Sequence, residues 1–513
     1  MVWGNPPPPL AMPSSRRLST SSATSSRSPS PVLATLDSSA ALILVHDPED
    51  SNTPFDFSSD DEGDDDGQSP QFDTRRASVP PLGPAVVFLY LLAPYLKLGA
   101  MLFPHTTLPL KYGLPPLFVF GVLSAFAKQI LYMLARYMRT ADIEDVVLDV
   151  FARGRGKERR RVVLRSILRG GTGTLRILLA TAYLRESARV LLPVLPESSV
   201  LPTQPLLAIA LALVVFPLTL AQSLASKRVI YSTWLSIASY MAWLGCVAYA
   251  HTRNTLQIEP DWVKMGALWQ GTTVVAFAFT SSSTLPLYAS LKWTTQPITT
   301  AKASKVRSFK GLSVISVAVA VLLTLPLVTI SAHPNTSLSD PQLSSAIATA
   351  VLNALTLLLG IPALIVTTPS LPIPERIRHA TTIPLSRTLL SILYTVLALV
   401  PTWASGLLSD ILLVLALAST YFFPALVHIT AHFFKRPLSI VIPQIPGTPL
   451  PGHSRQDSGP GSPRADELLL RKERALQKRQ FRRRIIWDIG VWVLLLGSIA
   501  GGALAVGRVM GRI

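Results

Sequence analysis

The sequence predicts an all-α polytopic membrane protein with about eleven transmembrane helices. Ten of them are expected to form a five-plus-five inverted-repeat transporter fold in which helices one and six are broken. Composition excludes a soluble protein, because 49% of the 513 residues are hydrophobic and only 15% are charged. The hydrophobic residues gather in long blocks that match the thickness of a bilayer. Two of these blocks, five apart along the chain, are interrupted at corresponding positions, which is typical of transporters with internal repeats.

Windows of roughly 17 to 25 mostly apolar residues, the length that crosses a bilayer, define the candidate spans. They lie at 84–106, 115–138, 174–196, 205–224, 229–250, 266–288, 311–332, 343–367, 386–404, 408–433 and 485–507. The third window carries Arg185, Glu186 and Arg189 in its middle. Arg185 and Arg189 share a helix face. These charges line a pathway, or pair with other helices, or mark a segment that lies partly in the membrane interface.

Lysine and arginine gather in the even-numbered loops, which follow the second, fourth, sixth, eighth and tenth spans. The loop after the second span holds Arg153, Arg155, Lys157, Arg159, Arg160, Arg161, Arg165 and Arg169. Because cytoplasmic loops carry such an excess, the even-numbered loops and the N-terminus are predicted to be cytoplasmic. The same bias explains the net charge of +18 without a nucleic-acid partner. The glycosylation acceptor Asn335, in the loop after the seventh span, lies on the opposite side and agrees with this topology.

The segments outside the core differ from it in composition. Residues 1–82 are rich in Pro, Ser and Asp and predict a disordered cytoplasmic tail. Two Arg-Arg-x-Ser sequences place Ser19 and Ser78 as phosphorylation sites for a basic-directed kinase, although such sequences also arise by chance in a Ser/Arg-rich tail. Residues 83–434 form the ten-helix core. Residues 435–484 are a basic cytoplasmic linker beside the anionic lipid surface, and 485–513 hold the eleventh helix and a short C-terminus.

The interruptions in the first and sixth spans predict the ligand site. Five hydroxyl residues, Thr280 to Thr284, precede Pro286 in the sixth span, and Gly99 and Ala100 precede Pro104 in the first. An interrupted helix is tolerated in a membrane where its backbone is buried in protein or lines a cavity. Each break alone is also typical of ordinary helix packing. Matched breaks favour a transport site at the membrane midplane. The partial charges at the ends of the half-helices would there attract the carboxylate and the amine of a ligand.

An amino acid is therefore the expected substrate. Its predicted contacts are Gly99, Ala100, Thr280, Ser281, Ser282, Ser283 and Thr284.

Four stretches resemble the amino acid/auxin permease family, which includes the fungal vacuolar and the animal neutral amino acid transporters. They are Phe277 to Thr280 with Leu285 to Lys292 in the sixth helix, Gly99 to Pro104 in the first, Leu359 to Pro362 with Glu375-Arg376 at the end of the eighth, and Phe422 to Leu426 in the tenth. The resemblance covers residues 84–434. It implies the five-plus-five inverted repeat, eleven spans, and an amino acid moved with protons or sodium, in a vacuolar or other endomembrane rather than the plasma membrane.

Two positions depart from the family pattern. Lys97 stands where the family usually has the first of two glycines, and Ser290 stands where it usually has an acidic residue. A charge inside the membrane is costly and tends to be functional. Lys97 would then supply the positive charge that a coupling ion otherwise brings, which favours protons over sodium. The alternative is that Lys97 snorkels toward an interface.

Two other classes of protein are alternatives to a transporter. A nutrient-sensing or scaffolding membrane protein would keep the transporter fold and show little or no flux. An enzyme is not expected, because the sequence holds no catalytic motif and implies no cofactor. His428 and His432 have the i, i+4 spacing of metal ligands, but no third ligand stands nearby, so packing roles and no metal site are expected. Cys246 lies in an apolar span and predicts no intrachain disulfide.

Overall fold

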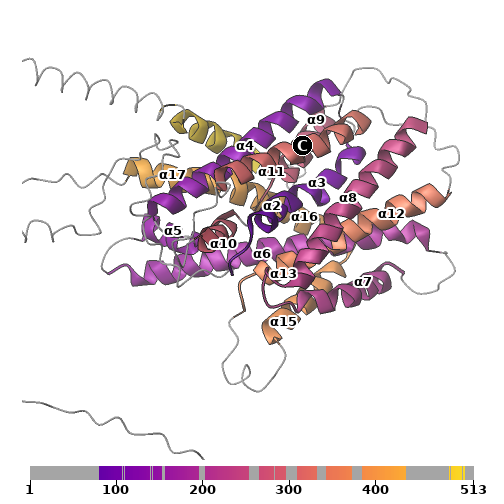
Figure 1. The fold of residues 1–513 in the computed structure, drawn as a ribbon, viewed down its shortest axis with the longest axis horizontal. Coiled ribbons are helices and arrows are strands. Elements are labelled where there is room, and N and C mark those ends of the chain that lie inside the picture. Colours follow the sequence, from indigo (N-terminus) through magenta and orange to yellow (C-terminus); the bar gives the residue numbers. More distant parts are fainter. Residues whose placement is uncertain are drawn as a thin grey trace, which may run out of the picture. The chain divides into compact units, whose positions relative to one another are not determined.

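The computed structural model describes residues 80–106, 108, 110–138, 140, 142–152, 156–195, 203–253, 265–281, 284–295, 309–331, 343–371, 384–434, 485, 487–499, 501 and 502. All of them belong to one compact unit, Phe55–Ile513. The predictions for Ser19, Ser78, Ser282, Ser283, Asn335 and the linker 435–484 fall outside the described residues. Every regular element in the described part is helical, which confirms the all-α prediction (Figure 1).

The first five spans are formed as follows. The first consists of α2 (Pro84–Leu92), the 3₁₀ turn η2 (Ala93–Leu96), α3 (Leu98–Met101) and η3 (Phe103–His105). The second is α4 (Leu110–Met138), and the third is α6 (Glu158–Leu191) with η4 (Leu192–Val194), preceded by the short α5 (Ile143–Phe151). The fourth and fifth are α7 (Thr203–Thr219) and α8 (Lys227–Arg253).

The next five spans contain more interruptions than the first five. The sixth consists of α9 (Met265–Ala278) and α10 (Thr284–Thr295), the seventh is α11 (Phe309–Ser331), and the eighth consists of α12 (Leu343–Leu358) and α13 (Ile361–Thr367). The ninth is α15 (Leu385–Ala398). The tenth is α16 (Thr402–Leu417), which continues through the π-helical turn η5 (Ala418–Phe422), α17 (Phe423–Ile429) and a second π-helical turn, η6 (Thr430–Phe434). A last apolar helix covers Trp487–Ile499.

The described helices meet the requirements of a membrane protein. Five are long and apolar enough to cross a bilayer, namely Pro84–Met101, Leu110–Arg136, Phe309–Ile330, Ile347–Thr367 and Ala404–His432. Gln204–Thr219, Leu385–Ala398 and Trp487–Ile499 are shorter apolar helices. Each window that the sequence predicted contains helix in the structure. The protein is therefore an all-α polytopic membrane protein.

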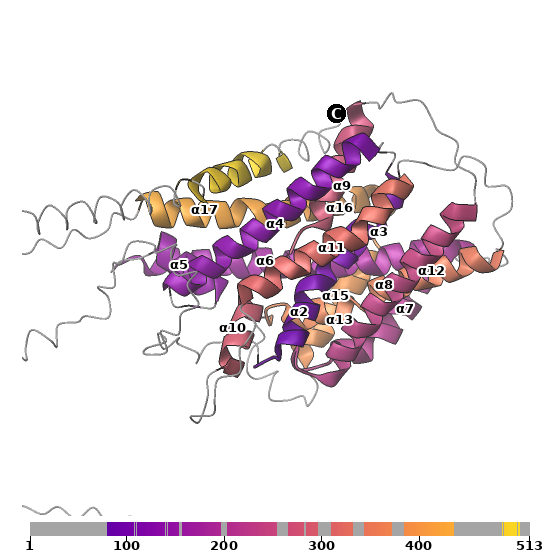
Figure 2. The ribbon, with the colours of Figure 1, turned by 45° about the horizontal axis from the view of Figure 1, so that its top comes forward.

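Helices that are five spans apart pack against each other. In the described part, α3 contacts α9, α4 contacts α11, α6 contacts α12, and α7 contacts α15. Figures 1 and 2 both show α4 and α11 side by side. Successive spans cross the membrane in opposite directions, so spans five apart run antiparallel. This is the relation between two halves of an inverted repeat.

Glycines bring the first and sixth spans into contact. A Cβ atom at Gly99 would overlap the backbone of Ala278, and a Cβ atom at Gly271 would overlap the side chain of Leu108. Close approach of helix backbones through small residues is a main source of packing in membrane proteins. The first and sixth spans are therefore in close contact at Gly99 and Ala278, and Leu108, which follows the first span, packs on Gly271.

The third span differs from its prediction. It is one helix of 34 residues that begins at Glu158, so the basic residues from Arg159 to Arg169 are helical rather than part of a loop. No proline interrupts this stretch, and arginine, leucine and alanine are good helix formers. Arg189 is exposed and lies 4.0 Å from Glu186. Arg185, Glu186 and Arg189 do not line the cavity described below.

The helix α5 was not predicted. Asp142 caps its first turn by accepting a hydrogen bond from the Glu144 backbone N–H at 3.1 Å. Its side chains Val146, Val147, Leu148 and Val150 are buried. The Arg169 guanidinium donates to the Glu144 carboxylate at 2.8 Å, which ties α5 to the start of α6.

Candidate functional site

The first span breaks at Lys97. Backbone angles of φ −111° and ψ −144° at this residue separate η2 from α3. Pro94 has no N–H, so the carbonyl of Leu91, three residues earlier, loses its 3₁₀ partner. Lys128 of α4 donates to that carbonyl at 3.4 Å, and its ammonium lies 4.5 Å from the centre of the Tyr95 ring. A lysine from the second span thus supports the broken backbone.

The sixth span breaks between Ala278 and Thr284. The Phe277 carbonyl accepts hydrogen bonds from the Thr280 backbone N–H at 3.1 Å and from its hydroxyl at 2.8 Å. The tenth span holds the same region, because the Ser281 N–H donates to the Thr420 hydroxyl at 3.1 Å. The Tyr421 hydroxyl donates to the Ala276 carbonyl at 3.1 Å. Thr420 and Tyr421 both belong to the π-helical turn η5. Such a distortion often occurs at functional sites.

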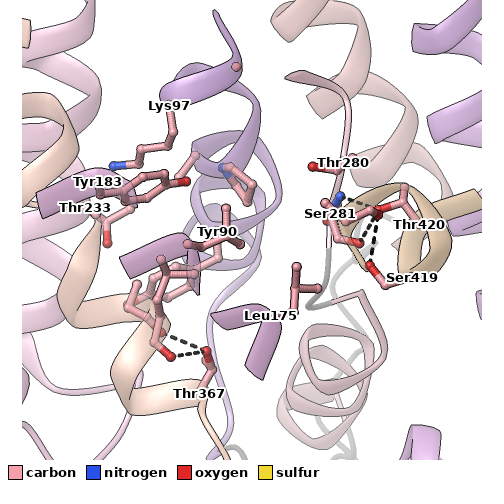
Figure 3. A pocket seen from close by; sticks show the side chains of 18 of the residues that line it. Tyr90, Lys97, Leu175, Tyr183, Thr233, Thr280, Ser281, Thr367, Ser419 and Thr420 are labelled. Atoms are coloured by element: carbon pink, nitrogen blue, oxygen red, sulfur yellow. Dashed lines mark hydrogen bonds between the residues drawn. The ribbon is translucent and has the colours of Figure 1, made fainter. Parts of the chain in front are cut away.

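A cavity of about 90 Å³ lies between the two breaks (Figure 3). Its polar lining comes from Tyr90, Lys97, Tyr183, Thr233, Thr280, Ser281, Thr367, Ser419 and Thr420. Its larger apolar lining comes from Leu175, Leu179, Leu224, Phe277, Leu287 and Leu364, and small or rigid residues complete it, Ala93, Pro94, Gly99, Gly360, Ala363 and Ala416. Lys97 is the one charged residue among the described residues that line this cavity.

The Lys97 side chain is buried where the first, fifth and eighth spans meet. Only 4% of the residue is exposed. Its ammonium donates to the Ser236 hydroxyl on α8 and, at 3.2 Å, to the Thr356 carbonyl on α12. A Cβ atom on Gly360 would lie 2.8 Å from the Lys97 Nζ, so the ammonium lies close against the Gly360 backbone. The side chain therefore does not reach toward a membrane interface, which rules out snorkelling in this structure.

The hydroxyl groups around the cavity present acceptors to it. Thr233 donates to the Val229 carbonyl at 2.8 Å, and Ser419 donates to the Ala416 carbonyl at 3.0 Å. Thr280 and Thr367 also donate to carbonyls of their own spans. A hydroxyl has one proton and two lone pairs, so each of these oxygens keeps the capacity to accept. The described lining thus combines one ammonium with several neutral acceptors.

The residues predicted from the sequence fall in three groups. Lys97, Gly99, Thr280 and Ser281 line the cavity. Ala100 and Thr284 are buried but do not line it. Ser282 and Ser283 are outside the described residues. His428 and His432 stack with ring centres 5.6 Å apart and do not line the cavity, and no group of three metal-binding side chains is found in the described ranges.

Sequence reasoning missed the lining from the third, fifth, eighth and tenth spans. Two signals were present for part of it. The eighth span is interrupted at Leu359 and Gly360, between α12 and α13, and Gly360 lines the cavity. Thr420 lies just before the Phe-Pro-Ala-Leu stretch of the tenth span. The third and fifth spans give no local signal, because Tyr183 and Thr233 lie in uninterrupted helices.

The cavity extends toward the even-numbered loops. Tyr90, Leu287 and Thr367 lie in the halves of their spans next to those loops, and Leu224 lies in the fourth loop itself. On the other side, Gly99 of the first span packs on Ala278 of the sixth, and Leu108, which follows the first span, packs on Gly271.

Comparisons with known proteins find similarity among solved structures. No protein-family model matches the chain, and no curated protein matches its sequence. The crystal structure of a manganese transporter from Eremococcus coleocola, in complex with an aromatic bis-isothiourea substituted compound, is similar, with 13% identity, a TM-score of 0.43, and coverage of 84% of this chain and 98% of that chain. The resemblance to the amino acid/auxin permease family stays a prediction from the sequence.

Proposed function

We propose that the protein is a secondary active transporter that moves amino acids across a vacuolar or other endomembrane by alternating access. The observation that carries the proposal is the cavity between the breaks of the first and sixth spans, which are in close contact at Gly99 and Ala278. A midplane site between discontinuous helices of an inverted repeat is the arrangement on which alternating access depends.

The polar lining is complementary to a free amino acid. A carboxylate is favoured beside an ammonium, and Lys97 has three N–H donors, of which two are used on Ser236 and Thr356. An amino group needs acceptors, which the hydroxyl oxygens of Thr280 and Ser419 provide. The carboxylate of the amino acid would therefore lie toward the break in the first span, and its amino group toward the break in the sixth.

Lys97 supports coupling to protons rather than sodium. In transporters with broken helices, exposed carbonyls and helix ends coordinate the driving cation. The Lys97 ammonium already contacts such oxygens, the Ser236 hydroxyl and the Thr356 carbonyl. A fixed ammonium in that place makes a sodium ion unnecessary, whereas a lysine can still release and regain a proton.

The test is uptake by purified full-length protein in proteoliposomes. A mixed pool of radiolabelled amino acids is supplied with and without an imposed pH gradient, and with sodium replaced by potassium. Uptake that follows the pH gradient and ignores sodium is expected. Binding without uptake, in protein whose folding is verified, would favour the alternative of a sensing or scaffolding membrane protein.

A further inference from the structure

We infer that the substrate is an amino acid with a neutral, apolar side chain, and that the site rejects cationic side chains and divalent metal ions. This inference rests on the proposed function and deepens it. It is drawn from the distribution of apolar and charged side chains around the cavity, not from any relative.

The apolar lining lies beside the polar groups that would hold the amino acid's backbone. Leu175 and Leu179 come from the third span, Leu287 from the sixth and Leu364 from the eighth. Figure 3 shows the side chains of Ser281, Ser419 and Thr420 grouped on one side of the cavity and Lys97 on the other. A ligand anchored at both poles must place its side chain against the leucines.

Such a lining selects for apolar surface. Each methylene that leaves water for an apolar environment improves binding by about fourfold. A leucine or isoleucine side chain would therefore bind far better than that of glycine or serine. A hydroxyl or amide placed there would lose its hydrogen bonds to water without gaining partners from the leucines.

The charge around the cavity excludes cations. Within the described lining, Lys97 is the one charged residue, and no Asp or Glu is present. The side chain of lysine or arginine as substrate would place a second positive charge in the protein interior without a carboxylate to pair with it. A divalent metal ion would also lack carboxylate, imidazole or thiolate ligands, because the described residues contain no such cluster.

The experiment is competition against labelled leucine uptake in proteoliposomes of the full chain. Unlabelled isoleucine, methionine and phenylalanine should compete at concentrations at least tenfold lower than lysine or arginine. Labelled Mn²⁺ should not enter above the level of empty liposomes. Equal competition by leucine and lysine would overturn the inference while leaving the proposed function intact. Absence of uptake for every amino acid would instead contradict the proposed function.

A charge variant sharpens the test. Leu179→Asp adds a carboxylate to the apolar lining and should let lysine compete at least tenfold better while weakening leucine. Leu179→Asn is the matched control, because it has nearly the same shape without the charge and should not improve lysine. If Leu179→Asp does not fold, Leu364→Asp with Leu364→Asn repeats the comparison from the eighth span. Improvement of lysine by both Asp and Asn would show that charge does not govern the choice.

Discussion

The break in the first span and the break in the sixth span border the same cavity, but opposite kinds of groups support them. At the first span, two buried lysines act as donors, Lys97 to Ser236 and Thr356, and Lys128 to the Leu91 carbonyl. At the sixth span, the neutral hydroxyl of Thr280 donates to the Phe277 carbonyl, and that of Thr420 accepts from the Ser281 N–H. One side of the cavity is therefore positive, and the other offers neutral acceptors.

The difference teaches that the two breaks occupy corresponding spans but present different chemistry to the cavity. Inverted repeats place equivalent helix breaks opposite each other. A substrate with two unlike ends needs unlike surroundings, and the side chains provide them. The variants below change one side at a time, beginning with the change that should have the largest effect.

Lys97→Met removes the positive side of the cavity. Hydrogen bonds to charged groups contribute about 1.5–3 kcal/mol, so amino acid uptake at low substrate concentration should fall by up to about 100-fold. The response to a pH gradient should be lost as well. Initial rates in proteoliposomes provide the measurement. Lys111→Met is the control, because Lys111 is an exposed lysine at the start of α4 and does not line the cavity.

Gly99→Ala separates the two breaks. The added methyl group would overlap the Ala278 backbone, and overpacking costs typically 1–3 kcal/mol. We expect a lower melting temperature and weaker closure on the side of the odd-numbered loops, measured by thermal unfolding and by labelling from that side. Gly245→Ala is the matched control, since no atom lies within 4 Å of its Cβ position. Equal effects of both variants would show that the close contact at Gly99 has no special role.

Thr420→Val changes the acceptor side. The substitution keeps the shape but removes the oxygen that accepts the Ser281 N–H at 3.1 Å. A lost hydrogen bond of about 1–1.5 kcal/mol should raise the KM for amino acid uptake about fivefold to tenfold, with little change in the pH response. Thr430→Val is the control, because the Thr430 hydroxyl donates only within its own span, to the Leu426 carbonyl at 2.8 Å. A change in the pH response by Thr420→Val would contradict the division of roles between the two breaks.

Tyr95→Phe should have the smallest effect. It removes the hydrogen bond between the Tyr95 and Ser124 hydroxyls at 2.9 Å but leaves an aromatic ring beneath the Lys128 ammonium. We expect a loss of about 0.5–1.5 kcal/mol in the free energy of unfolding and unchanged substrate preference. Thermal unfolding and leucine competition measure the two quantities. Altered competition by lysine would place Tyr95 in substrate selection rather than in support of the break.

The sequence predicted features that depend on local chemistry. Long apolar blocks marked the helices, and the Thr280 to Thr284 run with Pro286 marked a break, because hydroxyl groups and proline both disturb backbone hydrogen bonding. The position of Lys97 beside the first break was also visible. The hydrogen-bond partners of Lys97 could not be predicted, because Ser236 and Thr356 lie on other spans and only packing brings them near it.

Features that depend on packing were missed for the same reason. The helix α5 lies in a stretch that reads as a charged loop, and it becomes a helix on α6 through pairs such as Glu144 with Arg169. Thr233 and Tyr183 belong to uninterrupted helices, so nothing in their neighbourhood distinguishes them from other core residues. Side chains from distant spans define the apolar lining, which therefore emerges only in three dimensions.

The length of α6 has a mechanical consequence. A helix of 34 residues is about 51 Å long, whereas the hydrocarbon core is about 30 Å thick. The stretch from Leu175, on the cavity wall, back to Glu158 is about 26 Å long, so a tilt of about 10° would move that end by about 4 Å. If the cavity wall tilts during transport, a spectroscopic label on exposed Arg160 should report that motion without touching the cavity.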